Sequence, residues 1–232
     1  MLSVCMATFN GEAFLREQLL SVLPQLGPGD EVVISDDASS DGTCALVRAL
    51  GDGRIRLLEN SVRLGPIFNL ERALALARGE VVFLSDQDDL WLEGKVGACL
   101  EALKTADLVL HDAFILKGGT REPETLFERR KVARGFGRNI LKNSYSGCCM
   151  AFRRELLEVA LPFPRQIPMH DQWLALVAER KFRTAFLRVP FIDYRVHGGN
   201  VTRTGENRGF GILKKLSRRL GLVCALRSRG LL

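Results

Sequence analysis

The sequence predicts an α/β fold in which helices flank a mostly parallel central sheet, organised as a single domain with two halves. Two observations lead to this prediction. Short apolar, β-branched runs alternate with stretches of helical spacing over the first hundred or so residues, which is the pattern of βαβ units. The length of 232 residues suits one large α/β domain and supports a buried core.

The first half is expected to contain four strands connected by three helices. Residues 2–7 form an apolar run typical of a buried strand, and Asn10 is a suitable cap for a helix over residues 12–26. SSDGT at 39–43 is typical of a turn before a second helix that ends near Leu50. The other strands are expected at 31–36, 55–58 and 80–84, with the third helix at 66–78. Such connections imply parallel strands, whose carboxyl ends share one edge of the sheet, where ligands bind.

The pattern changes after about residue 107. A strand at 108–110 leads into a basic, irregular stretch through residue 143. The strand-like SGCCMAF follows, then a helix at 171–181 and two short strands that end in DYRVHGGNVT. We therefore divide the chain into a domain at 1–205, with halves at 1–105 and 106–205, and a C-terminal tail at 206–232.

Composition and charge limit the possible partners and the compartment. Residues 201–232 contain eight Lys or Arg and one Glu, a net charge of +7 within a total of +6, so residues 1–200 carry about −1. Because a nucleic-acid groove needs basic residues across the folded body, nucleic acid is not expected as a partner. No run of about 18 apolar residues occurs, and the N-terminal run is typical of a strand rather than a signal peptide. The six cysteines form no CxxC pair, which indicates reduced thiols in the cytoplasm.

Three carboxylates follow the fourth predicted strand within four positions, in FLSDQDDLW at 83–91. Asp89 alone is consistent with a cap for a helix that starts near Leu90. A polar turn does not explain Asp86 and Asp88, which are spaced i, i+2 at the carboxyl end of the fourth predicted strand. On an extended segment, this pair can approach one hard divalent cation, Mg²⁺ or Mn²⁺, which offsets their repulsion and leaves room for phosphate oxygens. A haloacid-type phosphatase is excluded, because its DxD follows the first strand, where this chain has ATFNG.

A second acidic pair, Asp36 and Asp37, ends the second predicted strand. Such a carboxylate accepts hydrogen bonds from a pyrimidine N–H or from ribose hydroxyls, or it caps the following turn. The chain has neither GxGxxG after its first strand nor GxxxxGK[ST], so phosphates would be held by a metal and by basic or polar side chains. Arg63 and Asn69, in NSVRLGPIFN, are the candidates.

Six segments in this order resemble family 2 glycosyltransferases of the GT-A fold: ATFNG, ISDDASSDGT, NSVRLGPIFNLERAL, LSDQDDLW, MHDQW and YRVHGGNVT. The resemblance covers residues 1 to about 204. It implies a nucleoside-diphosphate-sugar donor bound by the first half, an acceptor bound by the second, a divalent metal at the DxD, and transfer with inversion at the anomeric carbon. The wording of LSDQDDLW and YRVHGGN is most similar to bacterial rhamnosyltransferase-type members, which use dTDP-rhamnose.

The resemblance also implies roles on the donor side. Thr8 and Asp36 would face the base, Asp86 the ribose and Asp88 the metal. ATFN departs from the Pro and Tyr of many members, so Phe9 keeps a ring for stacking but has no hydroxyl. The full set expected at the nucleotide sugar is Thr8, Phe9, Asn10, Asp36, Asp37, Arg63, Asn69, Asp86 and Gln87.

Inverting transfer needs a carboxylate that takes the acceptor's proton, and Asp171 matches the position of that base in the family. N-capping of the helix at 171–181 is the alternative for Asp171. Trp173, with His170 beside the base, either walls the acceptor pocket or belongs to the core. His197 precedes two glycines in a loop that the family often closes over the diphosphate, so it is a candidate for the metal or phosphate, and otherwise structural.

The tail has the pattern of a basic amphipathic helix, although Gly221 weakens it. Such a helix either lies on an anionic membrane surface or docks on the protein's own body. Membrane contact at the cytoplasmic face would suit an acceptor attached to a lipid carrier. One face contains Ile212, Leu213, Leu216, Leu220 and Val223, and another contains Lys214, Lys215, Arg218 and Arg219.

The sequence therefore predicts a metal-dependent inverting glycosyltransferase of cell-surface polysaccharide synthesis, with dTDP-rhamnose or a UDP-sugar as donor and a saccharide or lipid-linked acceptor. One alternative is a sugar-phosphate nucleotidyltransferase, which usually has a basic Gly-rich loop after its first strand, unlike ATFNGEAF. Another is a non-catalytic nucleotide-sugar-binding protein of the same fold. The presence of both Asp88 and Asp171 argues against that alternative.

Overall fold

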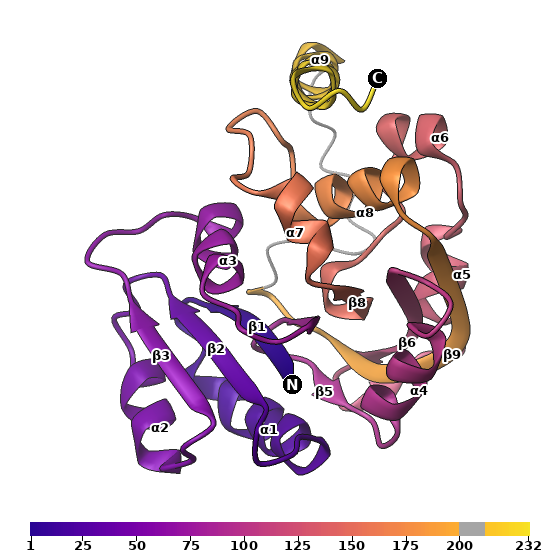
Figure 1. The fold of residues 1–232 in the computed structure, drawn as a ribbon. Coiled ribbons are helices and arrows are strands. Elements are labelled where there is room, and N and C mark those ends of the chain that lie inside the picture. The colour runs from indigo at the N-terminus through magenta and orange to yellow at the C-terminus, as the bar shows by residue number, and fades with distance from the viewer. Residues whose placement is uncertain (200–211) are drawn as a thin grey trace.

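A computed structural model describes residues 1–199 and 212–232, with side chains described for 1–199 and 216–232. The predicted boundary between domain and tail at 205/206 lies outside the described residues. Within them, the predicted α/β fold is confirmed: one curled sheet runs through the molecule, and helices cover its faces (Figure 1).

The first half forms the parallel part of the sheet. Its strands lie side by side in the order β3-β2-β1-β4, with parallel pairing throughout, so the predicted strands and connecting helices are confirmed, with shifts at their ends. The strands are β1 (Leu2–Thr8), β2 (Glu31–Asp36), β3 (Ile55–Glu59) and β4 (Val81–Ser85). The helices are α1 (Glu12–Val22), which a 3₁₀ turn (Leu23–Gln25) follows, α2 (Thr43–Leu50) and α3 (Pro66–Ala75).

Alternate residues of these strands supply two apolar layers, because successive side chains of a strand point to opposite faces of the sheet. In β1, Cys5 packs into one layer, while Val4 and Met6 pack into the other. In β4, Val82 and Phe83 divide in the same way. Burying side chains of this size stabilises the fold by roughly 1.5–3 kcal/mol each. The two layers therefore hold the carboxyl ends of the parallel strands in fixed positions.

The second half extends the sheet with mixed pairing. β8 (Met150–Arg153) pairs antiparallel with both β4 and β6 (Leu108–Lys117), and β6 pairs parallel with β9 (Thr184–Val196). Two short strands, β5 (Leu90–Trp91) and β7 (Thr120–Arg121), pair antiparallel with β9 and β6. The prediction of a mostly parallel sheet thus describes the first half. Because β5 follows β4 in sequence but pairs with β9, the loop at 86–89 is brought against the end of β9.

Helix α8 (His170–Lys181) packs against α6 (Phe136–Leu141) and α7 (Glu155–Ala160), and its residues from His170 to Ala178 are all buried. The other helices are α4 (Lys95–Ala102), which follows β5, α5 (Leu126–Arg130) and α9 (Ile212–Ser228). A 3₁₀ turn (Gly147–Cys149) precedes β8. Within the described ranges, no helix combines the length and apolar character that crossing a bilayer requires. All six cysteines are free of disulfide bonds.

Three local predictions are wrong. The two short strands expected at the end of the second half form one strand, β9, and at both predicted helix caps a contact distant in sequence replaced the local one. Leu90 begins a strand rather than a helix, and Asp89 accepts a hydrogen bond from the backbone N–H of Arg195 at 3.0 Å instead of capping. Asn10 does not cap α1, which begins after Gly11 without a side-chain cap. Instead, Oδ1 of Asn10 accepts a hydrogen bond from the backbone N–H of Ser40 at 2.9 Å.

Candidate active site

A cavity of about 310 Å³ lies at the carboxyl ends of β1 and β4, where the second half encloses it. This volume is within the range of roughly 300–1,000 Å³ that is typical of small-molecule sites. The structure brings most of the predicted donor-side residues and the predicted base together around this one cavity. Its wall includes Thr8, Phe9, Asp37, Arg63, Asn69 and residues 86–88 from the first half, and Arg130, residues 146–148, residues 169–171 and Tyr194 from the second.

The three carboxylates after β4 have different surroundings. Asp86 is exposed to the cavity. Asp88 is largely buried, and its Oδ2 lies 2.7 Å from Nε2 of His197, directly after β9. Asp89 is buried, and its Oδ2 has no hydrogen-bond partner among the described atoms. The pairing of β5 with β9 therefore places Asp88 and His197, the two predicted metal ligands, in direct contact.

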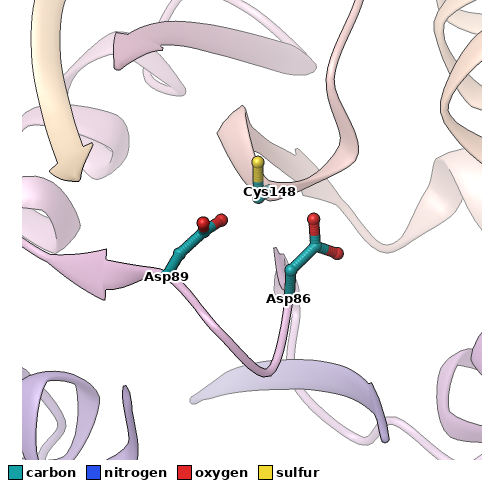
Figure 2. A group of neighbouring side chains, drawn as sticks. All are labelled: Asp86, Asp89 and Cys148. Carbon is teal, nitrogen blue, oxygen red and sulfur yellow. The ribbon is translucent and has the colours of Figure 1, made fainter. Parts of the chain in front are cut away.

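A thiol from the second half completes this acidic group (Figure 2). Ligand atoms of Asp86, Asp89 and Cys148 lie within 4.8 Å of one another. The Asp86 carboxylate reaches the water of the cavity but is surrounded by protein, and this burial, with the nearby charges of Asp88 and Asp171, raises its pKa. Burial and the charges of Asp86 and Asp88 also raise the pKa of Asp89. A bound cation would offset this crowding of negative charge, because it favours the ionised carboxylates.

The donor atoms present fit a divalent cation. Asp86 and Asp88 offer hard carboxylate oxygens, and His197 offers an imidazole nitrogen. Oxygen ligands are typical of Mg²⁺ and Mn²⁺ sites, and imidazole is a common ligand of transition metals. The unpartnered Oδ2 of Asp89 is a further acceptor beside the same loop.

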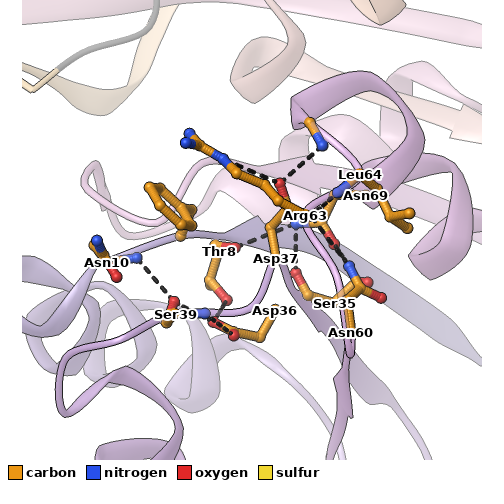
Figure 3. Close-up of polar contacts among 12 residues, drawn as sticks. Thr8, Asn10, Ser35, Asp36, Asp37, Ser39, Asn60, Arg63, Leu64 and Asn69 are labelled. Carbon is orange, nitrogen blue, oxygen red and sulfur yellow. Dashed lines mark hydrogen bonds and ion pairs between the residues drawn. The ribbon is translucent and has the colours of Figure 1, made fainter.

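Thr8 and Asp36, the residues predicted to face the base, are joined to each other. Oγ1 of Thr8 donates to Oδ1 of Asp36 at 2.8 Å, and Oδ2 of Asp36 accepts from the backbone N–H of Ser39 at 2.8 Å (Figure 3). Asp36 is 1% exposed. Of the predicted donor-side residues, Asp36 and Asn10 are absent from the described wall of the cavity. Asp36 therefore lies behind Thr8 and orients its hydroxyl.

Asp37, in contrast, lines the cavity and shapes the loop beside it. Its carboxylate accepts from the backbone N–H groups of Leu64 at 2.6 Å and Gly65 at 2.9 Å. This loop presents Arg63, whose guanidinium carbon lies 3.7 Å from the centre of the Phe9 ring. Phe9 and Arg63 thus form one wall that combines an aromatic surface with a positive charge.

Two of the predicted ligand-binding residues, Asn69 and Gln87, also make structural hydrogen bonds. Both amide hydrogens of Asn69 are donated to backbone carbonyls, to Thr8 at 3.2 Å and to Ser35 at 2.8 Å, so none remains for a phosphate. Gln87 accepts from the Phe9 N–H at 2.9 Å and donates to the Phe9 carbonyl at 3.2 Å. Asn69 therefore lines the cavity with its amide hydrogens already donated to the backbone, and Gln87 ties the loop after β4 to the loop after β1.

Asp171 faces the cavity from the first turn of α8. The N-cap of this helix is Met169, which makes no side-chain cap. Oδ1 of Asp171 accepts hydrogen bonds from Nδ2 of Asn143 at 3.1 Å and from the N–H of Gln172 at 2.6 Å. Oδ2 makes none of the hydrogen bonds described. Asp171 is therefore not the N-cap of α8 but a buried carboxylate oriented toward the cavity.

The two residues expected beside Asp171 differ in position. His170 lines the cavity, burial lowers its pKa, and its Nδ1 has no partner among the described residues. Trp173 is fully buried, and its indole N–H donates to the carbonyl of Ala160 at 2.9 Å. The prediction that Trp173 walls the acceptor pocket is wrong, because the first turn of α8 faces the cavity while Trp173 faces the core.

Among the residues of the cavity wall that sequence reasoning missed, Arg130, Cys148 and Tyr194 carry polar or reactive side chains. Arg130 lies in the basic stretch before residue 143, and its Nη1 donates to the carbonyl of Tyr145 at 2.8 Å. Burial raises the pKa of Tyr194, so its hydroxyl stays protonated. No spacing in the sequence distinguishes these three residues, because only the curl of the sheet brings them to the donor-side loops.

Comparisons with known proteins agree with this geometry. Over 94% of its length, the chain is 25% identical to dTDP-rhamnosyl transferase RfbG of Shigella flexneri, of which it covers 78%. Over 41% of its length it is 33% identical to an Escherichia coli protein, UDP-Glc:alpha-D-GlcNAc-diphosphoundecaprenol beta-1,3-glucosyltransferase WfgD, of which it covers 38%.

Solved structures share the fold at low sequence identity. Staphylococcus aureus TarS in complex with UDP-GlcNAc superposes with a TM-score of 0.69 at 23% identity, over 86% of this chain and 59% of TarS. Glucosyl-3-phosphoglycerate synthase from Mycobacterium tuberculosis, solved with Mn²⁺, UDP and phosphoglyceric acid, superposes with a TM-score of 0.62 at 21% identity, over 99% of this chain and 78% of that one. Residues 3–161, more than half of the chain, match the family described as glycosyl transferase family 2. With its GT-A fold, the chain therefore belongs to glycosyl transferase family 2.

Proposed function

We propose that this protein transfers a sugar from a nucleoside-diphosphate donor to a hydroxyl of an acceptor, with inversion at the anomeric carbon. One observation carries the proposal. A single cavity is lined by Asp86 and Asp88 from the donor half and by Asp171 from the acceptor half. Carboxylates that would hold a donor's metal and a carboxylate that would accept a proton thus line one cavity.

A divalent cation is part of the proposal. Asp88 and His197 would hold it, with Asp86 beside them, and Mn²⁺ or Mg²⁺ would supply charge that stabilises the leaving diphosphate. Arg63, on the wall formed with Phe9, adds a second positive group on the donor side. The ring of Phe9 would stack on the base, and Thr8, oriented by Asp36, would offer a hydroxyl to it.

Asp171 would act as general base. The acceptor hydroxyl loses its proton to Oδ2 of Asp171 as its oxygen attacks the anomeric carbon. The bond from that carbon to the diphosphate oxygen breaks on the opposite face, and the diphosphate leaves with the electron pair. The hydrogen bond from Asn143 to Oδ1 fixes the carboxylate plane. General-base assistance of this kind is typically worth about 10²–10⁴ in rate.

The names of the relatives support narrower proposals for the donor and the acceptor. A dTDP-rhamnosyl transferase and a UDP-glucose-dependent enzyme among them favour dTDP-rhamnose or a UDP-sugar as donor. The acceptor would be a saccharide or a lipid-linked saccharide of cell-surface polysaccharide synthesis. The protein would work in the cytoplasm, in peripheral contact with the inner face of the membrane.

The test is a calorimetric titration of nucleoside diphosphates and their sugars, with and without Mn²⁺ or Mg²⁺. We expect metal-dependent binding of a dTDP or UDP species that Asp88→Asn abolishes. Glu93→Gln is the matched control, because Glu93 is an exposed acid close in sequence that is absent from the described cavity wall. The donor that binds most tightly is then incubated with saccharide acceptors. If the folded protein binds no nucleotide, the proposal fails.

A further inference from the structure

Helix α9 has two apolar faces, and the body of the protein covers only one of them. Leu222, Ala225 and Leu226 are at most 2% exposed and belong to a core layer. Leu216 and Leu220 are 51% and 57% exposed. Because each helical residue turns by about 100°, Leu220 and Leu222 point about 160° apart. The exposed leucines therefore face away from the body.

Specific contacts hold α9 in this orientation. Arg229 donates to the carbonyls of Leu161 at 3.1 Å and Pro162 at 2.6 Å. A Cβ added at Gly221 would lie 3.0 Å from the carbonyl oxygen of Gln166, so this glycine permits the close approach of α9. Docking on the body and contact with a membrane, the two alternatives predicted for the tail helix, are thus compatible. The helix docks on the body through one face and still presents a leucine face outward.

The outward leucines continue onto the neighbouring helix. Nη2 of Arg219 donates to the carbonyl of Leu141, the last residue of α6, at 2.8 Å. The side chain of Leu141 is 62% exposed. We call Leu141, Leu216 and Leu220 the leucine patch. It lies where α9 packs against α6, and Figure 1 shows α9 along its axis near α6.

The sequence around the leucine patch is strongly basic. Residues 212–232 contain six Lys or Arg and no Asp or Glu, and residues 131–142, which include α6, contain four Lys or Arg and no acid. Apolar side chains bordered by basic ones are typical of helices that lie in the headgroup region of an anionic bilayer. A second copy of the chain is a poorer partner, because its own basic surface would repel this one.

We propose that the leucine patch docks the protein onto an anionic membrane surface, with Leu141, Leu216 and Leu220 among the headgroups and the basic side chains near lipid phosphates. The inference rests on the proposed function in one respect: a lipid-linked acceptor would be reached from the membrane surface. The geometry agrees, because Asn143, two residues after the patch residue Leu141, contacts the proposed base Asp171. Docking would hold the acceptor side of the cavity close to the lipid surface.

The experiment is flotation of the full chain with vesicles of phosphatidylglycerol and phosphatidylcholine, compared with phosphatidylcholine alone, at low and high salt. We expect binding to the anionic vesicles that high salt weakens. The double variant Leu216→Ser/Leu220→Ser should lower the bound fraction about tenfold. The matched control is Leu20→Ser/Val62→Ser, which removes side chains of similar exposure, 50% and 64%, from the donor half.

Each outcome decides the inference. Failure of the protein to bind anionic vesicles, or equal loss in the control variant, overturns it. Self-association that Leu216→Ser/Leu220→Ser abolishes would assign the patch to a second copy instead. Donor binding is measured on the same variants by calorimetry. A protein that binds donor but not vesicles overturns the membrane inference alone, and one that binds vesicles but no nucleotide overturns the proposed function alone.

Discussion

The two halves of the protein present polar side chains to one cavity in different ways. On the donor side, side chains are held by the backbone: Asn69 bonds two carbonyls, Gln87 bonds both polar groups of Phe9, and Asp37 accepts two N–H groups. On the acceptor side, Nδ1 of His170 has no partner among the described residues, and Asp171 lines the cavity with no hydrogen bond described for its Oδ2.

This difference indicates that the two halves have different roles, donor binding in the first and reaction of the acceptor in the second. A preorganised donor side loses little conformational entropy when it binds a nucleotide sugar. An acceptor side with unsatisfied polar groups keeps them for the reacting hydroxyl. Substitutions in the first half should therefore affect folding and donor affinity, and those in the second half should affect the rate of transfer.

The largest expected effect is on the acceptor side. Asp171→Asn keeps the size of the side chain but cannot take a proton, so kcat for transfer should fall about 10²–10⁴-fold. Donor affinity, measured by calorimetry, should not change. Glu158→Gln, on the exposed side of α7, is the control. Near-normal turnover by Asp171→Asn would disprove its role as base.

On the donor side, Asn69→Ala should reduce stability. It leaves the buried carbonyls of Thr8 and Ser35 without these donors, at a cost of about 1–3 kcal/mol in the free energy of unfolding. Urea denaturation measures the loss. Asn143→Ala is the matched control on the acceptor side and should change stability much less, because Asn143 is only partly buried. Equal losses would contradict the proposed contrast between the halves.

Asn143→Ala should instead slow transfer. The hydrogen bond from Nδ2 of Asn143 to Oδ1 of Asp171 fixes the plane of the carboxylate, so its loss leaves the proposed base less well oriented toward the acceptor hydroxyl. The kcat for transfer should fall roughly tenfold, whereas donor affinity measured by calorimetry should not change. Equal losses of kcat and of donor affinity would indicate a purely structural role for Asn143.

The smallest expected effect is that of Gln87→Ala. It removes two hydrogen bonds to the backbone of Phe9 at the partly exposed rim of the cavity, worth about 1 kcal/mol of stability. Donor affinity should weaken by roughly fivefold, since Phe9 becomes less ordered, whereas kcat at saturating donor should change little. A large decrease in kcat would mean that Gln87 contacts the reacting groups directly.

The successes and failures of the sequence predictions have a common physical basis. The four parallel strands and the position of Asp86 and Asp88 were predicted because strand ends in βαβ units share one edge, whereas Asp171 was placed by the family resemblance. The sequence could not separate the possible roles of Asn69 and Trp173, because a polar or aromatic residue beside a motif has the same sequence pattern whether it contacts ligand, backbone or core. Hydrogen bonds to carbonyls far along the chain decided both cases.

The sequence alone determined the α/β class, the donor edge of the sheet and the acidic loop, because these depend on local periodicity and on the order of strands. Only the tertiary structure decided which side chains meet across the cavity. The contact between Asp88 and His197, the approach of Cys148 to Asp86 and Asp89, and the outward leucine face of α9 all depend on pairing and packing between segments distant in sequence. Local patterns do not encode such contacts, because many packings satisfy the same pattern and only the complete core selects one.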